Sequence, residues 1–151
     1  MNQLPPWIVP FLGVAWLLLV WCGTLIVVAR LGGWIALAAR YRATDRFEGH
    51  RWHFQDAGFR WWSNYGKALT VGANGEGLYL AITIPIFPAH PPLFIPWSET
   101  KMEMKHSFWQ GGDYLEIRFP EVPTTVVKLR KKLAAKIAAA VGPEMLQQQT
   151  V

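Results

Sequence analysis

The histidines are the first residues whose type and spacing could bind a metal ion, because His50 and His53 stand three positions apart. In a strand, side chains alternate between the two faces, so residues three apart point to opposite faces. A tetrahedral metal site also needs further ligands, and His90 and His106 are isolated from this pair in the sequence. Cys22, the single cysteine, lies in an apolar run and cannot form an intramolecular disulfide. We therefore expect no metal ion and no other cofactor.

Carboxylates and hydroxyls are the other groups that could carry out catalysis. Three glutamates share strand-like segments with basic residues: Glu99, Glu103 and Glu116 with Lys101, Lys105 and Arg118. This alternation is typical of a solvated sheet face with cross-strand ion pairs. The serines, at positions 63, 98 and 107, stand outside any G-x-S-x-G motif. The sequence therefore predicts a protein that is not an enzyme.

The first predicted secondary-structure element is an uncharged run near the N-terminus. Residues 7–29 contain no charged side chain and are mostly Leu, Val, Ile, Trp and Phe. As a helix they would be roughly 34 Å long, enough to cross a hydrocarbon core of about 30 Å. A cleaved signal peptide would need a basic start and a shorter apolar run, and residues 1–7 contain no Lys or Arg. The pattern predicts an uncleaved transmembrane anchor over residues 1–30.

Basic residues follow the anchor but do not precede it. Five arginines come after the apolar run: Arg30, Arg40, Arg42, Arg46 and Arg51. Because basic residues at the ends of a span are retained on the cytoplasmic side, we expect the N-terminus outside and the C-terminal domain in the cytoplasm. These features are typical of a single-pass protein of a bacterial inner (plasma) membrane. The net charge of +5 fits attraction to anionic lipid headgroups.

Residues 31–46 connect the anchor to the rest of the chain. Gly32-Gly33 predicts a bend, and an apolar stripe with helical spacing follows it: Leu31, Trp34, Ile35, Ala38 and Tyr41. We interpret this segment as an interfacial or linker helix, which either lies in the membrane surface or packs on the domain. The residues expected at the membrane interface are Trp7, Arg30, Trp34, Arg40, Tyr41 and Arg42.

Residues 47–129 change from helical to strand-like periodicity. Five segments carry β-branched or aromatic residues with partial alternation: KALTVGA, GLYLAIT, LFIPW, TKMEMKHSF and YLEIRF. Further strand candidates are residues 50–55, residues 59–62 and TTVVKL, while ANGEG, FPAHPP and QGGD are typical of turns. This pattern predicts about seven antiparallel strands in a sandwich or partly open barrel.

The last predicted element is a helix in RKKLAAKIAAAV, which ends at Gly142 and Pro143. Its apolar face is formed by Leu129, Leu133, Ile137 and Val141. We expect this face to cap an open end of the β structure. The β domain would then occupy residues 47–142, followed by a disordered tail at 143–151.

Two motifs resemble pleckstrin-homology-like domains of the bacterial GRAM type. Residues 77–80, GLYL, are similar to a "gl.l" strand of that family, and residues 95–99, IPWSE, are similar to its "i.w..i" strand. Small single-span bacterial membrane proteins also carry GLYL and HPPLFIPW in this order. The resemblance covers roughly residues 47–141 and implies seven strands capped by one C-terminal helix.

In the family that the chain resembles, basic residues around the first strand pair clamp inositol phosphates. The corresponding turn is expected here near residues 56–58, which include one acidic residue and no basic residue. The resemblance therefore does not lead us to expect phosphoinositide binding.

Residues 90–97, HPPLFIPW, form the most distinctive local sequence. Pro96 lacks an N–H group, so this strand belongs at a sheet edge or carries a bulge. The edge could dock a partner segment, or it could shield the sheet from aggregation. The residues of this predicted partner edge are His90, Pro92, Phe94, Pro96 and Trp97.

We interpret the chain as a membrane-anchored interaction module that binds a protein partner, or a second copy of itself, at the cytoplasmic membrane surface. The alternative is a peripheral sensor of anionic lipid headgroups that uses Arg40, Arg42, Lys131 and Lys132. A hydrolase or metal enzyme has the least support, and no nucleic-acid partner is expected because the sequence has no recognised DNA or RNA module.

Overall fold

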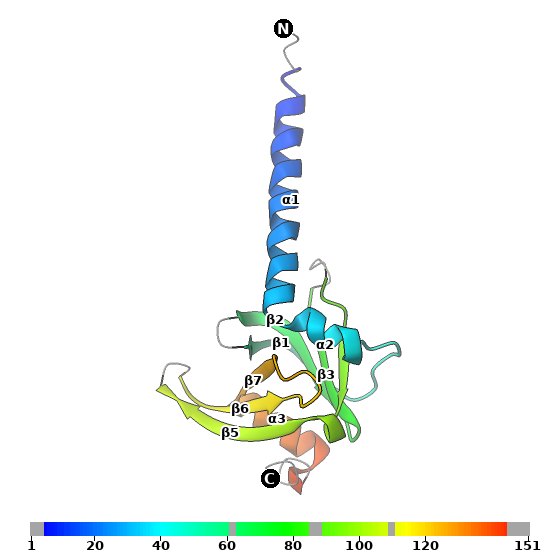
Figure 1. The fold of residues 1–151 in the computed structure, drawn as a ribbon, viewed down its shortest axis with the longest axis vertical. Coiled ribbons are helices and arrows are strands. Elements are labelled where there is room, and N and C mark those ends of the chain that lie inside the picture. Colours follow the sequence, from blue (N-terminus) through cyan, green and yellow to red (C-terminus); the bar gives the residue numbers. More distant parts are fainter. Residues whose placement is uncertain (1–4, 61–62, 85–88, 109–110, 145–151) are drawn as a thin grey trace.

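The structure is a computed structural model that describes residues 5–60, 63–84, 89–108 and 111–144. Helix α1 (Ile8–Leu31) projects from a β domain and stands free over most of its length (Figure 1). By length and composition it could cross a membrane, and it is the one such helix in the described part of the chain. Pro10 lies in its first turn, where a proline interrupts no helical hydrogen bond.

The described residues form one antiparallel sheet with the strand order β4-β3-β2-β1-β7-β6-β5. The strands are β1 (His50–Phe59), β2 (Ser63–Ala73), β3 (Gly77–Ile82), β4 (Leu93–Pro96), β5 (Lys101–Ser107), β6 (Gly112–Arg118) and β7 (Val126–Arg130). A short 3-10 helix, η1 (Trp97–Glu99), joins β4 to β5. The sheet curls into a half-barrel (Figure 1). The predicted fold class, an apolar N-terminal helix with seven antiparallel strands and a C-terminal helix, is confirmed.

Alternation along the strands places one face of the sheet in the core. On β3, Leu78 and Leu80 are fully buried, while Tyr79 between them lies on the opposite face. The same two-residue period buries Leu93 and Ile95 on the neighbouring strand β4. The core therefore lies on the concave side of the half-barrel, and the opposite side is left for other segments to cover.

The turn predicted near residues 56–58 is wrong, because these residues lie inside β1. The strand contains register shifts on both sides of Gln55, and such bulges break the two-residue period. One bent strand therefore looks like two short candidates in the sequence. The turn to β2 begins at Arg60, which has φ 54°, and residues 61–62 lie outside the described residues. The fact that residues 56–58 include no basic residue therefore says nothing about the composition of the β1–β2 turn.

Helix α3 (Lys131–Val141) packs on the concave face, as the sequence predicted. Leu133 and Ile137 are buried against the sheet, and Gly142 ends the helix with φ 101°. Leu129 and Arg130 belong to β7 and not to the helix, because their segment pairs with β1 and β6. Most of the predicted tail, residues 145–151, lies outside the described residues.

Helix α2 (Trp34–Tyr41) packs on the domain, which decides between the two alternatives for this segment. Trp34, Leu37 and Tyr41 are buried, and the Trp34 ring lies 5.3 Å from Phe59 and 5.7 Å from Tyr65 between centroids. The expected placement of Trp34 and Tyr41 at the membrane interface is therefore wrong. The buried face of α2 contacts the core, because the concave side of a half-barrel offers it more apolar contacts than a wet interface. Leu31, the first residue of the predicted stripe, belongs to α1 and is 50% exposed.

Candidate functional site

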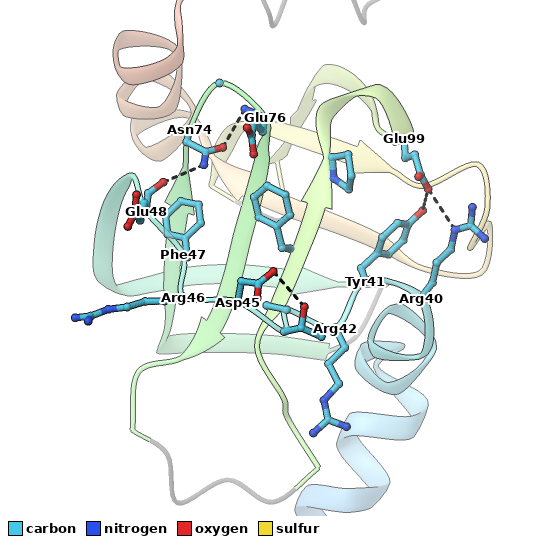
Figure 2. A pocket seen from close by; sticks show the side chains of 15 residues that line it. Arg40, Tyr41, Arg42, Asp45, Arg46, Phe47, Glu48, Asn74, Glu76 and Glu99 are labelled. Atoms are coloured by element: carbon cyan, nitrogen blue, oxygen red, sulfur yellow. Dashed lines mark hydrogen bonds and ion pairs between the residues drawn. The ribbon is translucent and has the colours of Figure 1, made fainter.

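An open groove lies beside one edge of the sheet, between the chain that connects α2 to β1 and the β2–β3 turn (Figure 2). Its volume is about 1010 Å³. The connecting chain supplies residues 40–48, the β2–β3 turn supplies residues 74–76, and β4 with η1 supplies Phe94, Pro96 and Glu99. The groove exists because the connecting chain crosses the face of the sheet opposite α3.

Aromatic packing holds the connecting chain on the sheet. The Phe47 ring stacks on Tyr79 of β3 with centroids 4.6 Å apart, and lies 6.1 Å from the Phe94 ring. Gly72 leaves room for this ring, because a Cβ there would come within 2.7 Å of it. The Arg51 guanidinium covers the Phe47 ring and donates a hydrogen bond to the Phe47 carbonyl oxygen. The apolar base of the groove is therefore held in place.

A cluster of charged and hydroxyl groups forms the wall nearest α2. Glu99 accepts hydrogen bonds from the Tyr41 hydroxyl at 2.8 Å and from Arg40 Nε at 3.2 Å. Arg40 also pairs with Glu121 at 3.5 Å. The bonds from Tyr41 and Arg40 hold the pKa of Glu99 below its usual value, so this carboxylate is ionised at neutral pH. The cluster links the end of α2 to η1.

Asn74 organises the opposite wall. Its side-chain N–H donates to the Glu48 carbonyl oxygen at 2.9 Å, while its Oδ1 accepts from the backbone N–H groups of Glu76 and Gly77. Its own carbonyl oxygen accepts a hydrogen bond from Trp97 Nε1 at 2.8 Å. One side chain and its backbone therefore tie together the connecting chain, the β2–β3 turn and η1.

Unpaired charges of both signs line the groove, but the cationic side chains turn away from it. In the described part of the chain, three lining carboxylates have no cationic partner: Asp45, Glu48 and Glu76. Asp45 and Glu76 lie on opposite sides of the groove, whereas Arg42 and Arg46 extend away from it (Figure 2). The groove thus presents apolar side chains between unpaired carboxylates.

The structure separates the residues of the predicted partner edge, although β4 is an edge strand as predicted. Phe94 and Pro96 line the groove, whereas His90 and Trp97 are buried. The Pro92 carbonyl oxygen accepts a hydrogen bond from the connecting chain at 2.9 Å. Because that chain covers the first part of the edge and Pro96 has no N–H to offer, little of β4 is open to an added strand.

The basic residues considered for lipid headgroups do not share one surface. Arg40 is engaged in the groove wall, and Lys131 pairs with Asp113 at 2.7 Å. Lys131 and Lys132 begin α3, which lies at the end of the domain away from α1 (Figure 1). Arg42 points toward the end of the domain on which α1 stands (Figure 2).

Two other residues predicted for the membrane interface lie near the ends of α1. Trp7 caps the first turn and is 65% exposed, and Arg30 is exposed in the last turn. Both positions are compatible with headgroup contact, which stays a prediction.

The histidines have separate surroundings. His53 Nδ1 lies 2.9 Å from Thr70 Oγ1, and the His50 ring stacks beside Trp52. His90 Nε2 lies 2.9 Å from the Tyr65 hydroxyl inside the domain. Within residues 5–60, 63–84, 89–108 and 111–144, no group of three or more His, Cys, Asp or Glu is placed to hold a metal ion.

The predicted cross-strand ion pairs on β5 and β6 are confirmed, but their central carboxylate is buried. Glu116 accepts a hydrogen bond from Lys105 Nζ at 2.7 Å and pairs with Arg118 at 2.6 Å. Burial acts to raise the pKa of Glu116, but the hydrogen bonds from Lys105 and Arg118 outweigh it and the pKa lies below its usual value. Glu99, expected on the same face, lies in η1 instead.

No protein-family model, curated protein or solved structure matches this chain. The groove and the apolar helix α1 are therefore the structural features that bear on function. Sequence reasoning missed most of the groove: Asp45, Phe47, Glu48, Asn74 and Glu76. The one local signal was ANGEG, which predicts a turn but does not indicate which segment that turn contacts.

Proposed function

We propose that the protein is a membrane-anchored interaction module that binds a basic and apolar segment of a protein partner in the groove. The observation that carries this proposal is the groove itself, which Phe94 and Pro96 line together with the unpaired carboxylates of Asp45, Glu48 and Glu76. Its role is recognition and not catalysis. A partner segment with apolar side chains between Lys or Arg residues matches both the base and the charges of the groove.

The rigid frame of the groove supports recognition of a defined segment. Phe47 is stacked on Tyr79, and the Asn74 side chain is hydrogen bonded to the backbone of Glu48 and to that of Glu76. A site that is already formed loses little conformational entropy when a partner binds. The carboxylates also attract a cationic segment before contact, which raises the association rate at low salt.

The domain belongs, on this proposal, to the pleckstrin-homology-like class and lies in the cytoplasm at a bacterial inner membrane. The seven strands, their order and the capping helix support the fold class that the motifs imply. The arginines after the apolar helix support the orientation, because none precedes it.

Peptide binding to the full-length protein in lipid nanodiscs tests the proposal. A fluorescent peptide that alternates Arg with Leu should bind, and the same peptide with Glu in place of Arg should not. Phe94→Asp and the double variant Glu48→Gln/Glu76→Gln should each abolish or strongly weaken binding. Glu144→Gln removes an exposed carboxylate outside the groove and serves as the matched control.

Salt dependence separates the contributions of charge and apolar contact. Binding should weaken as ionic strength rises, because charge attraction is screened within a Debye length of about 10 Å at 0.1 M. Equal affinity for the basic and the acidic peptide, or undiminished binding by Phe94→Asp, would show that the groove is not the binding site.

A further inference from the structure

The last two turns of α1 have two different sides. Leu25 and Ala29 are 9% and 0% exposed, because the domain covers them. On the outer side of the same turns, Ile26, Val27 and Leu31 are 38%, 53% and 50% exposed. In these two turns, one side of α1 is therefore covered by the domain, and the opposite side exposes apolar side chains.

The part of α1 that stands free of the domain is too short to span the hydrocarbon core by itself. Residues 8–24 form a helix of about 25 Å, which is less than a hydrocarbon core of about 30 Å. A membrane that stopped there would also leave Ile26, Val27 and Leu31 in water. Arg30, exposed in the last turn, suits the headgroup level. The bilayer surface should therefore lie near the last turn of α1, and not above the domain.

Two described segments between β3 and β4, residues 83–84 and 89–92, lie at the end of the domain from which α1 projects (Figure 1). The first segment carries Ile84, which is 50% exposed, and the second is joined to the helix junction by the hydrogen bond from Trp34 Nε1 to the Pro91 carbonyl oxygen. Residues 78–98 contain no Asp, Glu, Lys or Arg, so no charged side chain of this segment itself opposes entry into lipid.

We infer that the β domain is itself partly inserted in the bilayer, with Ile84 in contact with lipid chains beside Ile26 and Val27. The occupant of this surface is the membrane that holds α1, and the surface is continuous with the exposed side of the helix. The chain then has two membrane contacts, the α1 span and Ile84 on the domain, which together restrict rotation of the domain about the helix axis. This inference rests on the membrane anchor in the proposed function and extends it to the domain.

Lipid-located quenchers test the inference on the full chain. In a Cys22→Ala background, single cysteines replace Leu18, Ile84 or Met104 and carry an environment-sensitive fluorophore. Met104 is the matched control, since it is also 50% exposed but lies on β5, which Figure 1 shows away from α1. In vesicles with spin-labelled acyl chains, emission should be lost at positions 18 and 84 to a similar degree and retained at position 104.

The labels at positions 18, 84 and 104 distinguish the membrane span of α1 from the insertion of the β domain. Quenching at 18 with no more quenching at 84 than at 104 would overturn the insertion of the domain and leave the anchor intact. Absence of quenching at 18 and 84 alike would overturn the anchor, and the insertion with it. Blue-shifted emission at 84 but not at 104 on transfer from detergent to vesicles is the expected independent sign of an apolar environment.

Discussion

Trp34 Nε1 donates a hydrogen bond to the Pro91 carbonyl oxygen at 3.0 Å, across 57 positions of sequence. This contact joins the first residue of α2 to the chain that enters β4. The Trp34 side chain is fully buried, so the segment directly after α1 is part of the domain core. The domain is therefore fixed to α1, and is not suspended from it by a flexible linker.

Trp34→Ala should lower the stability of the domain by about 3–5 kcal/mol, because it removes a fully buried aromatic side chain. That is a large part of a total stability of about 5–15 kcal/mol. Thermal unfolding of the full-length protein in detergent measures the effect. Trp16→Ala, at a position that is 67% exposed on α1, is the control. Equal melting temperatures for both variants would show that Trp34 is not part of the core.

Gly33→Ala should destabilise the junction between the two helices. Gly33 has φ 89°, and a Cβ there would come within 2.3 Å of Thr125 Oγ1. The backbone strain alone costs on the order of 1–3 kcal/mol. Thr125→Ala should restore part of the lost stability in the double variant, because it removes the contacts of Oγ1 and Cγ2 but neither the close contact of the Thr125 Cβ, at 3.1 Å, nor the backbone strain. Gly23→Ala, where a Cβ meets open space, should leave the melting temperature unchanged.

Leu133→Ala should cost about 2–5 kcal/mol of folding free energy, because this side chain is 3% exposed between α3 and the sheet. Lys132→Ala, one residue earlier on the exposed side of the same helix, should have little effect. Chemical unfolding of the full chain compares the two variants. If Leu133→Ala unfolded at the same denaturant concentration as the wild type, α3 would not be packed on the concave face in solution.

The ion pairs of Glu116 should make stability depend on pH. Its pKa in the folded protein lies below the ordinary value of 4.5, so its contribution is present above that value and is lost as pH falls through the folded pKa. Glu116→Gln should therefore lower the melting temperature more at neutral pH than in acid. Glu103→Gln, which changes an exposed glutamate of the same ion-paired group, should lower it less at neutral pH. A Glu116→Gln deficit that stays constant into the acid range would contradict the ion-pair explanation.

The orientation of the chain is tested with reporters fused after Val151. A reporter that is active only in the cytoplasm should be active, and one that requires export should be inactive, because all basic residues follow the uncharged run of residues 7–29. Lysines added before Trp7 should reduce or invert this bias. Activity of the exported reporter in the unmodified chain would place the domain on the other side of the membrane.

The sequence by itself determined the elements that depend on local chemistry. An uncharged apolar run produces α1, and short apolar and aromatic runs next to turn residues, in GLYL and LFIP, produce β3 and β4. Gly142 at the end of an Ala-rich helix sets the end of α3, since a glycine adopts φ 101° at little cost. These features involve residues close together in the chain, so their pattern can be read without knowing what they contact.

Only the tertiary structure decided which surfaces those elements share. The stripe of α2 fits a membrane interface and a protein core equally well, and the contacts of Trp34 with Phe59 and Tyr65 place it in the core. Asn74 looks like any turn asparagine until its bond to the Glu48 carbonyl oxygen closes one wall of the groove. Contacts of this kind depend on how well segments that are distant in sequence pack together. A local residue pattern does not report the free-energy differences between competing contacts.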